Sequence, residues 1–256
     1  MDLGIVKVPV LLLVGGFGTR LRSVLSDKPK PLAPIGEISF LELLVLQLRS
    51  QGFRQLVMCS GFRAEQIRRE FGDGSKWSMR VEYSEETQPL GTAGAIKLAE
   101  PFLERSPEFV VMNGDSFLEI DLGQLIRIHR EQGALATIAV RRVPDASRYG
   151  TVQLDDCNRI TQFSEKTGIQ SSGIINGGVY VFNRDILQEI PNAPSSLEQD
   201  VLPGMLKHRV FAVEQTGMFI DIGTPEDYAR AQSLYHSLSR AAGLEPRTDR
   251  SRQPQG

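Results

Sequence analysis

A run of glycines directly after an apolar segment is the first part of this sequence that could do chemistry. Gly15, Gly16 and Gly18 lie within Gly15–Leu21, which follows the apolar segment Val8–Val14. Glycines at the end of a buried strand let backbone N–H groups approach an anion closely. A Gly-rich turn alone is about as often structural as functional, so the surrounding residues have to decide between the two.

Two familiar phosphate-binding patterns do not fit this run. A P-loop requires Lys-Ser or Lys-Thr after its last glycine, and no such pair follows here. A dinucleotide-binding loop requires a third glycine where this chain has Leu21, and an acidic residue at the end of the second strand, which here ends in Cys59 and Ser60. Both interpretations are therefore disfavoured.

Two cations accompany the glycines. Arg20 belongs to the run itself, and Lys30 follows between Pro29 and Pro31, which stiffen the loop and fix where the lysine points. A pair of solvated surface charges is the alternative interpretation. Attachment to a glycine-rich anion loop favours an anion-binding role, with Arg20 and Lys30 as candidate catalytic residues.

The elements that must position these residues alternate between strand and helix. Apolar runs followed by amphipathic segments predict a parallel sheet covered by helices on both faces. Ligands of such sheets lie beyond the carboxyl ends of the strands, where the Gly-rich run and Asp115 are placed. The predicted strands are Val8–Val14, Gln55–Ser60, Arg80–Tyr83 and Phe109–Met112; the predicted helices are Ser39–Ser50, Arg63–Phe71 and Gly91–Leu98.

The alternation of predicted strands and helices ends at about residue 133. Short strands joined by turns predict antiparallel pairing at Ala134–Val140, Thr151–Leu154, Arg159–Phe163 and Gly178–Phe182. Two helices are expected to follow, over Ser196–Lys207 and from Thr224 to about Arg240. We expect one domain over residues 1–242, with halves at about 8–133 and 134–242, and a disordered tail over 243–256.

Composition excludes several classes of protein. The chain has 256 residues, 41% hydrophobic and 23% charged, which is an ordinary globular composition. A formal net charge of −2 does not favour a nucleic-acid binder, and no apolar segment is long enough to span a membrane. The two cysteines, Cys59 and Cys157, are too few and too far apart for a zinc site or a disulfide framework, and they fit the cytoplasm.

The residues Gly15–Leu21 together with Pro29, Lys30 and Pro31 resemble the signature of the sugar-1-phosphate nucleotidylyltransferases. The resemblance extends from about Pro9 to about Ala231. It implies a glycosyltransferase-A-like fold, in which a Rossmann-like nucleotide-binding half joins an antiparallel sugar-binding portion. Transfer of a nucleotidyl group joins two anions, so the site needs cations, backbone donors and carboxylates for Mg²⁺, and no nucleophilic side chain.

The resemblance also implies a role for each matching residue. Arg20 and Lys30 would act on the phosphates, and Asp115 and Asp221 would hold Mg²⁺ as hard oxygen ligands. The implied nucleotide-binding residues are Gly15, Gly16, Gly18, Thr19, Gln88, Pro89, Gly91, Thr92 and Gly94. The implied sugar-phosphate-binding residues are Tyr149, Gly150, Glu165, Lys166, Asn176 and Gly177.

Within that family, the stretch Thr19–Pro34, with Asn113–Ser116 and Phe219–Gly223, is similar to the D-glycero-α-D-manno-heptose 1-phosphate guanylyltransferases. The similarity implies GTP and a heptose 1-phosphate as partners in a cytoplasmic enzyme, with neither nucleic acid nor membrane, and a possible homo-oligomer. Mannose-1-phosphate guanylyltransferase is the alternative, followed by a glucose-1-phosphate thymidylyl- or uridylyltransferase. A regulatory protein that holds a nucleotide sugar without catalysis is the alternative of a different class.

Overall fold

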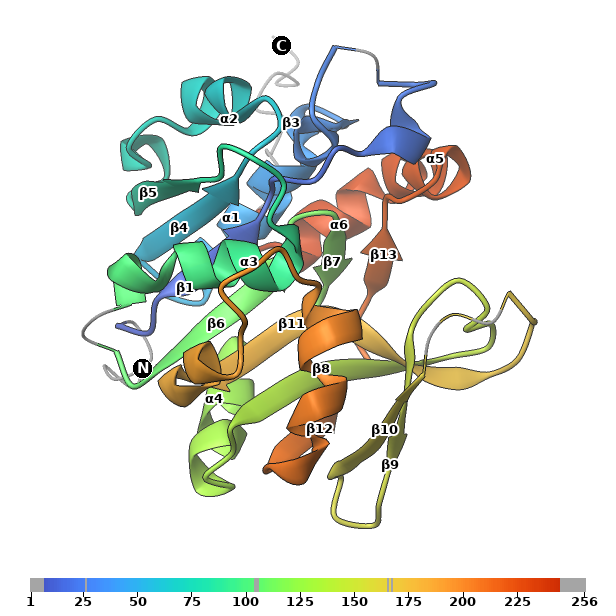
Figure 1. Cartoon of the computed structure of the whole chain (residues 1–256). Coiled ribbons are helices and arrows are strands. Elements are labelled where there is room, and N and C mark those ends of the chain that lie inside the picture. Colours follow the sequence, from blue (N-terminus) through green and yellow to red (C-terminus); the bar gives the residue numbers. More distant parts are fainter. Residues whose placement is uncertain (1–6, 26, 104–105, 165, 167, 245–256) are drawn as a thin grey trace, which may run out of the picture.

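A nine-stranded mixed sheet forms the centre of the protein, seen here in a computed structural model that describes residues 7–25, 27–103, 106–164, 166 and 168–244 (Figure 1). Its strands are β1 Val10–Leu13, β4 Gln55–Ser60, β5 Arg80–Glu85, β6 Glu108–Asn113, β8 Ala136–Val143, β9 Thr151–Leu154, β10 Ile160–Ser164, β11 Gly173–Asn183 and β12 Val210–Glu214. Two small sheets pair β2 Pro34–Ile35 with β3 Ile38–Ser39, and β7 Ser116–Leu118 with β13 Phe219–Asp221.

The sheet is parallel on one side and antiparallel on the other. Its main path runs β10-β9-β11-β6-β1-β4-β5, and β8 joins β11 to β12. Strands β6, β1, β4 and β5 are parallel to one another, whereas β11 is antiparallel to β6, β8 and β9. Four parallel strands therefore bring their carboxyl ends to one edge of the sheet, next to the antiparallel part.

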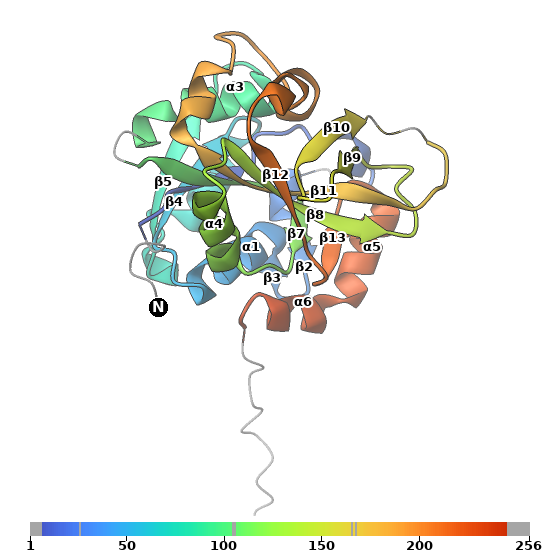
Figure 2. The ribbon, with the colours of Figure 1, turned by 90° about the horizontal axis from the view of Figure 1, so that it is seen from below.

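Helices cover both faces, because alternate side chains of the central strand are buried on opposite sides. Val10 and Leu12 of β1 belong to one apolar core, and Leu11 belongs to the other. The first core is completed by α1 Phe40–Ser50, α2 Ala64–Phe71, α4 Leu122–Glu131, α5 Pro225–Ser233 and α6 Tyr235–Ala241; the second is completed by α3 Gly91–Leu98 and the segment 186–205. Figure 2 shows α3 on one side of the sheet and α1, α5 and α6 on the other. The predicted α/β class is confirmed.

The long strand β11 changes partners at a pair of glycines. Its register with β8 shifts between Asn176 and Val179, and Gly178 has a φ of +73° that favours glycine. A side chain at Gly178 would place its Cβ atom 2.8 Å from the Ser116 Oγ atom. The bulge therefore lets β11 pass close to β7, just beyond the end of β6.

Local signals explain where the helices begin. The Ser39 hydroxyl caps α1 by accepting a hydrogen bond from the Glu42 N–H at 3.3 Å, and Thr224 caps α5 through the Asp227 N–H. Two predicted helices are wrong in extent. Residues 196–207 form a π-turn over Leu197–Val201 and a 3₁₀-turn over Pro203–Lys207, because Pro203 has no N–H to continue a helix.

The second wrong helix is the one predicted from Thr224 to Arg240. It divides at Leu234, whose backbone angles leave the helical range, and α6 restarts at Tyr235. The Tyr235 ring lies against Gly36, where a Cβ atom would come within 2.5 Å of it. Part of the predicted tail, residues 245–256, lies outside the described residues. Over the described ranges, no helix is long and apolar enough to cross a membrane.

A buried histidine on α4 makes folding sensitive to acid. His129 is 3% exposed, its Nδ1 atom lies 3.0 Å from the Thr137 hydroxyl, and burial lowers its pKa to about 4. Because this pKa is below the value of about 6.5 in the unfolded chain, the unfolded state binds the proton more tightly between pH 6.5 and pH 4. His129 therefore has no effect on stability above about pH 6.5, where it is neutral in both states. The free energy of unfolding falls progressively as the pH is lowered from about 6.5 to about 4.

We expect the free energy of unfolding to fall by about 2 kcal/mol, through His129 alone, when the pH is lowered from 7.5 to 5. In His129→Gln, whose side chain keeps a polar partner for Thr137 without titrating, the loss of stability over this pH range becomes smaller by that amount. Urea unfolding of both proteins at the two pH values measures the difference. An equal pH dependence in wild type and variant would contradict the assignment.

Candidate active site

The carboxyl ends of four neighbouring strands form the floor of a cleft. Strands β5, β4, β1 and β6 lie side by side in that order, and the chain leaves them at Glu86, Gly61, Val14 and Gly114 respectively. A cavity of about 500 Å³ opens at this edge. Its walls combine the Gly-rich loop, the start of α3 and the segment after β13. The placement is the one expected for ligands of a parallel sheet.

The Gly-rich loop and the Pro-Lys-Pro segment are packed directly against each other. Gly18 has a φ of +57°, and a Cβ atom there would lie 2.8 Å from the Cβ atom of Lys30. Leu21 and Leu32 are buried and hold the two segments in the core. Only glycine therefore fits at residue 18, and the contact fixes Lys30 beside the backbone of the loop. Arg20 lines the same cavity, and no ion pair of Arg20 is found within the described part of the chain.

Lys30 joins the loop to the aspartate that follows β6. Its Nζ atom lies 2.8 Å from the Asp115 Oδ2 atom, and the lysine side chain is only 13% exposed. The second aspartate is brought to the same place by the small sheet of β7 and β13, in which Asp221 is directly opposite Ser116. The Ile222 N–H also donates to the Asp115 carbonyl at 3.0 Å. Two aspartates 106 residues apart in sequence thus meet beside one lysine.

The environment of Asp221 is poorly suited to a free negative charge. Burial raises its pKa to about 6, the nearby Asp115 carboxylate contributes to the rise, and Lys30 only partly offsets both effects. The Gly223 N–H donates a short hydrogen bond to the Asp221 Oδ1 atom. A positively charged ligand between the two carboxylates would relieve their repulsion.

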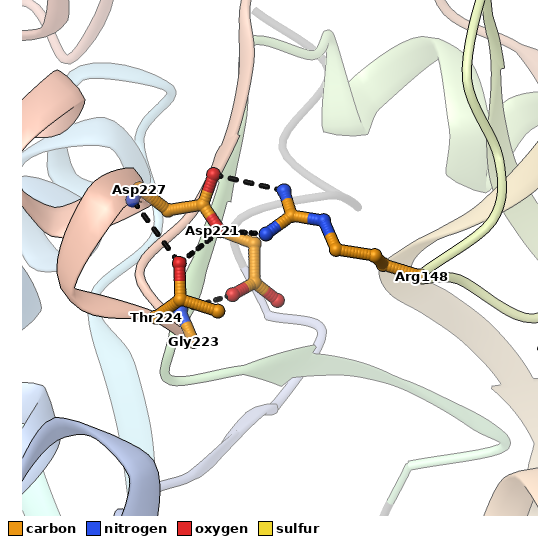
Figure 3. A network of polar contacts seen from close by, with 5 residues as sticks. All are labelled: Arg148, Asp221, Gly223, Thr224 and Asp227. Carbon is orange, nitrogen blue, oxygen red and sulfur yellow. Dashed lines mark hydrogen bonds and ion pairs between the residues drawn. The ribbon is translucent and has the colours of Figure 1, made fainter. Parts of the chain in front are cut away.

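A second charged pair closes the cleft beside Asp221. Figure 3 shows the Arg148 guanidinium donating two hydrogen bonds to the Asp227 carboxylate, of 2.8 and 3.0 Å. The Thr224 hydroxyl donates to the same carboxylate at 2.9 Å. Burial acts to raise the pKa of Asp227, but the hydrogen bonds from Arg148 and Thr224 outweigh it and lower that pKa. The bidentate pair ties the loop after β8 to the start of α5.

A second cavity, of about 390 Å³, continues from the first. The two share five lining residues, namely Asn113, Arg148, Tyr149, Lys166 and Asp221. One of these, Asn113, carries a buried Oδ1 atom that has no hydrogen-bond partner among the described residues. The cleft therefore has two lobes that meet at Asp221.

A polar network links the two lobes. The Tyr180 hydroxyl, which is fully buried, accepts from Asn176 at 2.9 Å and donates to Glu198 at 3.1 Å. The other Glu198 oxygen accepts from the Thr92 hydroxyl at 2.9 Å. Asn176 and Glu198 line the second lobe, whereas Thr92 lines the first. The same hydrogen-bonded chain thus has members on the wall of each lobe.

Most residues implied by the resemblance lie on the cleft. The first lobe is lined by Gly15, Gly16, Gly18, Thr19, Arg20, Lys30, Pro89, Gly91, Thr92 and Asp115, the second by Gly150 and Asn176, and both by Tyr149, Lys166 and Asp221. Gln88 is exposed and lines neither lobe, and Gly94 and Gly177 are buried in their elements. Glu165 lies outside the described residues.

Besides Asp227, two carboxylates on the cleft were not expected from the sequence. Glu86 lines the first lobe and Glu198 the second. Glu86 follows β5, which is two residues longer than the predicted strand, so its place at the carboxyl edge was hidden. Glu198 lies in the segment predicted as a regular helix, and no sequence signal distinguishes it there.

We compared the sequence and the fold of this chain with those of known proteins. The sequence profile described as nucleotidyl transferase matches residues 9–237. A D-glycero-alpha-D-manno-heptose 1-phosphate guanylyltransferase from Aneurinibacillus thermoaerophilus is 40% identical over 232 residues, which cover 89% of this chain and 99% of that protein. The crystal structure of HddC from Yersinia pseudotuberculosis complexed with GMP-PN superposes with a TM-score of 0.80 and 34% identity, over 90% of this chain and 100% of that one.

A longer protein is also similar. The mannose-1-phosphate guanylyltransferase catalytic subunit beta of Drosophila pseudoobscura pseudoobscura is 38% identical over 233 residues, which cover 90% of this chain. The match spans 63% of the length of that protein. Both the family match over most of the chain and the full-length relative support the same assignment: this protein belongs to the nucleotidyl transferase family.

Proposed function

We propose that the protein transfers GMP from GTP to D-glycero-α-D-manno-heptose 1-phosphate, giving GDP-heptose and pyrophosphate. The observation that carries this proposal is the shared wall of the two lobes, which brings Asp221 and Lys166 to both cavities. A nucleotide in the first lobe and a sugar phosphate in the second would meet there. The heptose guanylyltransferase relative at 40% identity supports the choice of substrates.

The reaction needs one bond to form and one to break. An oxygen of the sugar phosphate attacks the α-phosphorus of GTP, the bond from that phosphorus to the β-phosphate oxygen breaks, and pyrophosphate leaves with the electron pair. Because both reactants are anions, the protein mainly has to position them and neutralise charge. We assign Arg20 to the departing phosphates, Lys30 to the α-phosphate and Lys166 to the phosphate of the sugar.

The residues present fit a divalent cation. Asp115 and Asp221 converge beside Lys30, and burial together with the Asp115 carboxylate raises the pKa of Asp221. Two carboxylates with substrate phosphates and water are a common ligand set for Mg²⁺. We propose that these aspartates hold Mg²⁺, which would withdraw charge from the phosphates when bound. Lys30 would then be released from Asp115 to contact phosphate oxygen.

The acceptor could also be mannose 1-phosphate, since a mannose-1-phosphate guanylyltransferase subunit shares 38% identity with this chain. The two sugars differ by one CH–OH group, a small difference for a pocket to read. We favour the heptose because the relative named for it matches along 99% of its own length. The product would serve bacterial surface polysaccharide synthesis, and we place the reaction in the cytoplasm, where the free thiols of Cys59 and Cys157 stay reduced.

Pyrophosphate release tests the proposal. GTP, dTTP, UTP and CTP are each combined with heptose, mannose and glucose 1-phosphates in the presence of Mg²⁺. We expect the highest kcat/KM with GTP and the heptose. Faster release with mannose 1-phosphate would keep the reaction and overturn the acceptor. Tight binding of a nucleotide sugar without any release would favour the regulatory alternative.

Removing the cation of the Gly-rich loop should abolish turnover without unfolding the protein. Arg20 is exposed and makes no ion pair within the described ranges, so Arg20→Ala leaves the thermal melting temperature unchanged. Loss of one phosphate contact in the transition state is expected to lower kcat by about 100-fold or more. Arg127→Ala, which removes an exposed arginine from α4, is the matched control with normal turnover. Near-normal turnover in Arg20→Ala would reject its role.

Asp221→Asn should separate catalysis from stability. In metal-free protein at pH 8 the variant removes a buried charge whose folded pKa of about 6 exceeds its unfolded value, so we expect a gain of about 2 kcal/mol in unfolding free energy. The gain should shrink as the pH falls through 6 toward 4, because wild-type Asp221 then becomes protonated. Turnover should be lost at every pH.

Chemical denaturation with a chelator present measures the gain in stability. Asp156→Asn, at an exposed aspartate, is the control for a lost surface charge. A variant that is less stable than wild type at pH 8 would contradict the raised pKa of Asp221, and with it the combined cost of burial and of the Asp115 charge.

A further inference from the structure

We propose that a third cavity, beside the Gly-rich loop, binds a free inorganic phosphate anion, either orthophosphate or pyrophosphate, while the nucleotide occupies the first lobe. The inference goes beyond the proposed reaction, because it concerns three cations that line neither lobe of the cleft, namely Arg22, Lys28 and Arg63. Such a site would let the concentration of free phosphate act on the neighbouring nucleotide site.

The third cavity has a volume of about 240 Å³ and shares one wall with the first lobe. Phe17, Gly18 and Lys30 line both cavities, whereas none of the described residues lines both the third cavity and the second lobe. The chain at Gly18 therefore separates two spaces. The third cavity is smaller than the roughly 300–1,000 Å³ of typical sites for drug-sized ligands. It fits a small anion better than a second nucleotide.

The lining of the third cavity carries positive charge and, over the described residues, no acidic side chain. Four of its lining residues are cations, namely Arg22, Lys28, Lys30 and Arg63. Lys30 is already paired with Asp115, but the other three form neither an ion pair nor a side-chain hydrogen bond within the described ranges. The acidic residues Asp27 and Glu65 are close in the sequence and do not line the cavity. Three unpaired cations around one cavity repel one another, and a bound anion would offset this repulsion.

The Phe62 ring holds two of these cations in place. The Arg22 and Arg63 guanidinium carbons lie 5.4 and 5.2 Å from the centre of this ring. The ring itself is anchored to the Gly-rich loop, because the Phe62 N–H donates to the Gly15 carbonyl at 3.2 Å and the centre of the Phe17 ring lies 5.4 Å away. A guanidinium that rests on an aromatic face keeps its N–H groups available for oxygen acceptors. Both arginines are therefore positioned to donate to one anion in the cavity.

Arg63 also occupies a backbone conformation that arginine rarely adopts. Its φ of +55° lies in the left-handed region, directly before α2, where glycine or asparagine is usual. The Gln66 N–H donates to the Arg63 carbonyl at 3.0 Å, so the turn belongs to the start of the helix. Backbone geometry would thus favour a glycine, and Arg63→Gly removes the cation without disturbing the turn.

The set of donors matches phosphate oxygen better than a carboxylate. A guanidinium presents paired N–H groups that bind two phosphate oxygens at once, and a lysine ammonium adds a compact positive charge. The two arginines and Lys28 can therefore contact different oxygens of one tetrahedral anion, whereas a carboxylate offers only two oxygens. Orthophosphate and pyrophosphate share this chemistry, and pyrophosphate is also a product of the proposed reaction.

Calorimetric titration of orthophosphate tests the site. The protein is first saturated, in metal-free buffer, with guanosine 5′-[β,γ-imido]triphosphate, which fills the first lobe. The variants are Arg63→Gly and Lys28→Gln, each of which removes one cation of the third cavity. Arg69→Gln, at an exposed arginine of α2 that lines none of the three cavities, is the control for charge, and Ser78→Gly, at another left-handed residue with a φ of +56°, is the control for the backbone. A second series with pyrophosphate shows which of the two anions binds more tightly.

We expect one orthophosphate per nucleotide-saturated chain, and a Kd about 10-fold higher in Arg63→Gly and in Lys28→Gln, since each loses a charge-assisted contact. Arg69→Gln and Ser78→Gly should bind as wild type does. The melting temperature of Arg63→Gly should not fall, because glycine suits the left-handed backbone. Should this variant fail to fold, Lys28→Gln, at an exposed side chain, decides. No orthophosphate bound to the saturated protein, or the same Kd in all variants, would overturn the proposal.

The site should also be visible in the kinetics of nucleotide-sugar formation, as partial inhibition. An anion in the third cavity repels the triphosphate across the shared wall at Gly18, so orthophosphate raises the KM for GTP in wild type to a plateau about 3- to 10-fold above its starting value. In Arg63→Gly, about 10-fold more phosphate should be needed to reach the plateau. Competition for the first lobe alone would instead raise KM in proportion to the phosphate concentration, without a plateau, and would contradict a separate site.

A failure of the proposed function would look different. If the nucleotide analogue gives no binding heat, or if no acceptor sugar gives turnover, the proposed guanylyl transfer is wrong. Orthophosphate is then titrated into Arg20→Ala, in which the cation of the first lobe is missing. Binding that weakens when Lys28→Gln is added to this variant still supports the third cavity, and binding that Lys28→Gln leaves unchanged rejects it.

Discussion

The structure of the cleft depends on holding two carboxylates, Asp115 and Asp221, close together beside one lysine, Lys30. In the proposed reaction two anionic substrates meet within bonding distance, and Lys30, Asp115 and Asp221 lie together at that point of the cleft. The ion pair of Lys30 and Asp115 at 2.8 Å is the contact on which this arrangement depends, because it joins the Pro-Lys-Pro segment, which packs against the Gly-rich loop, to the end of β6. Asp221 completes the cluster, where burial and the neighbouring Asp115 carboxylate raise its pKa, and in our proposal a bound cation offsets both effects.

The sheet explains how such distant residues meet. The parallel strands β5, β4, β1 and β6 present their carboxyl ends along one edge, so the loops after them form one floor. The antiparallel strands extend the same sheet and form the second lobe. The small pairing of β7 with β13 carries Asp221 across to Asp115. The position of the cleft thus follows from strand order, and the helices serve mainly to bury the two faces.

The fold could be predicted from the sequence where local signals are strong. Apolar runs and Gly or Ser boundaries located β4, α3 and β9 with the bounds that the structure has. Local signals failed where tertiary packing decides the outcome. Pro203 stops a helix that amphipathic spacing favours, and Tyr235 packs against Gly36 where a continuous helix was expected. The three-residue strands β7 and β13 are too short to be read from periodicity.

The same distinction applies to the site. The spacing of the glycines and of Lys30 pointed to an anion-binding loop, whereas the two aspartates were expected only from the resemblance; the structure places all of them on the first lobe. Glu86 and Glu198 have no such context, since an acidic residue in a polar segment is common on any surface. Only the cavities show that these two carboxylates face the cleft. Their burial and their hydrogen-bond partners are properties of the folded chain and cannot be inferred from the neighbouring residues in the sequence.

The central claim is that two substrates react directly in one cleft, without a covalent intermediate on the protein. The stereochemical course at the α-phosphorus tests it most directly. The protein is given one diastereomer of guanosine 5′-O-(1-thiotriphosphate), and ³¹P NMR assigns the configuration of the thio-nucleotide sugar formed. A single in-line displacement predicts inversion at phosphorus. Retention would require two successive displacements, and therefore a nucleotidylated side chain, which would contradict the account.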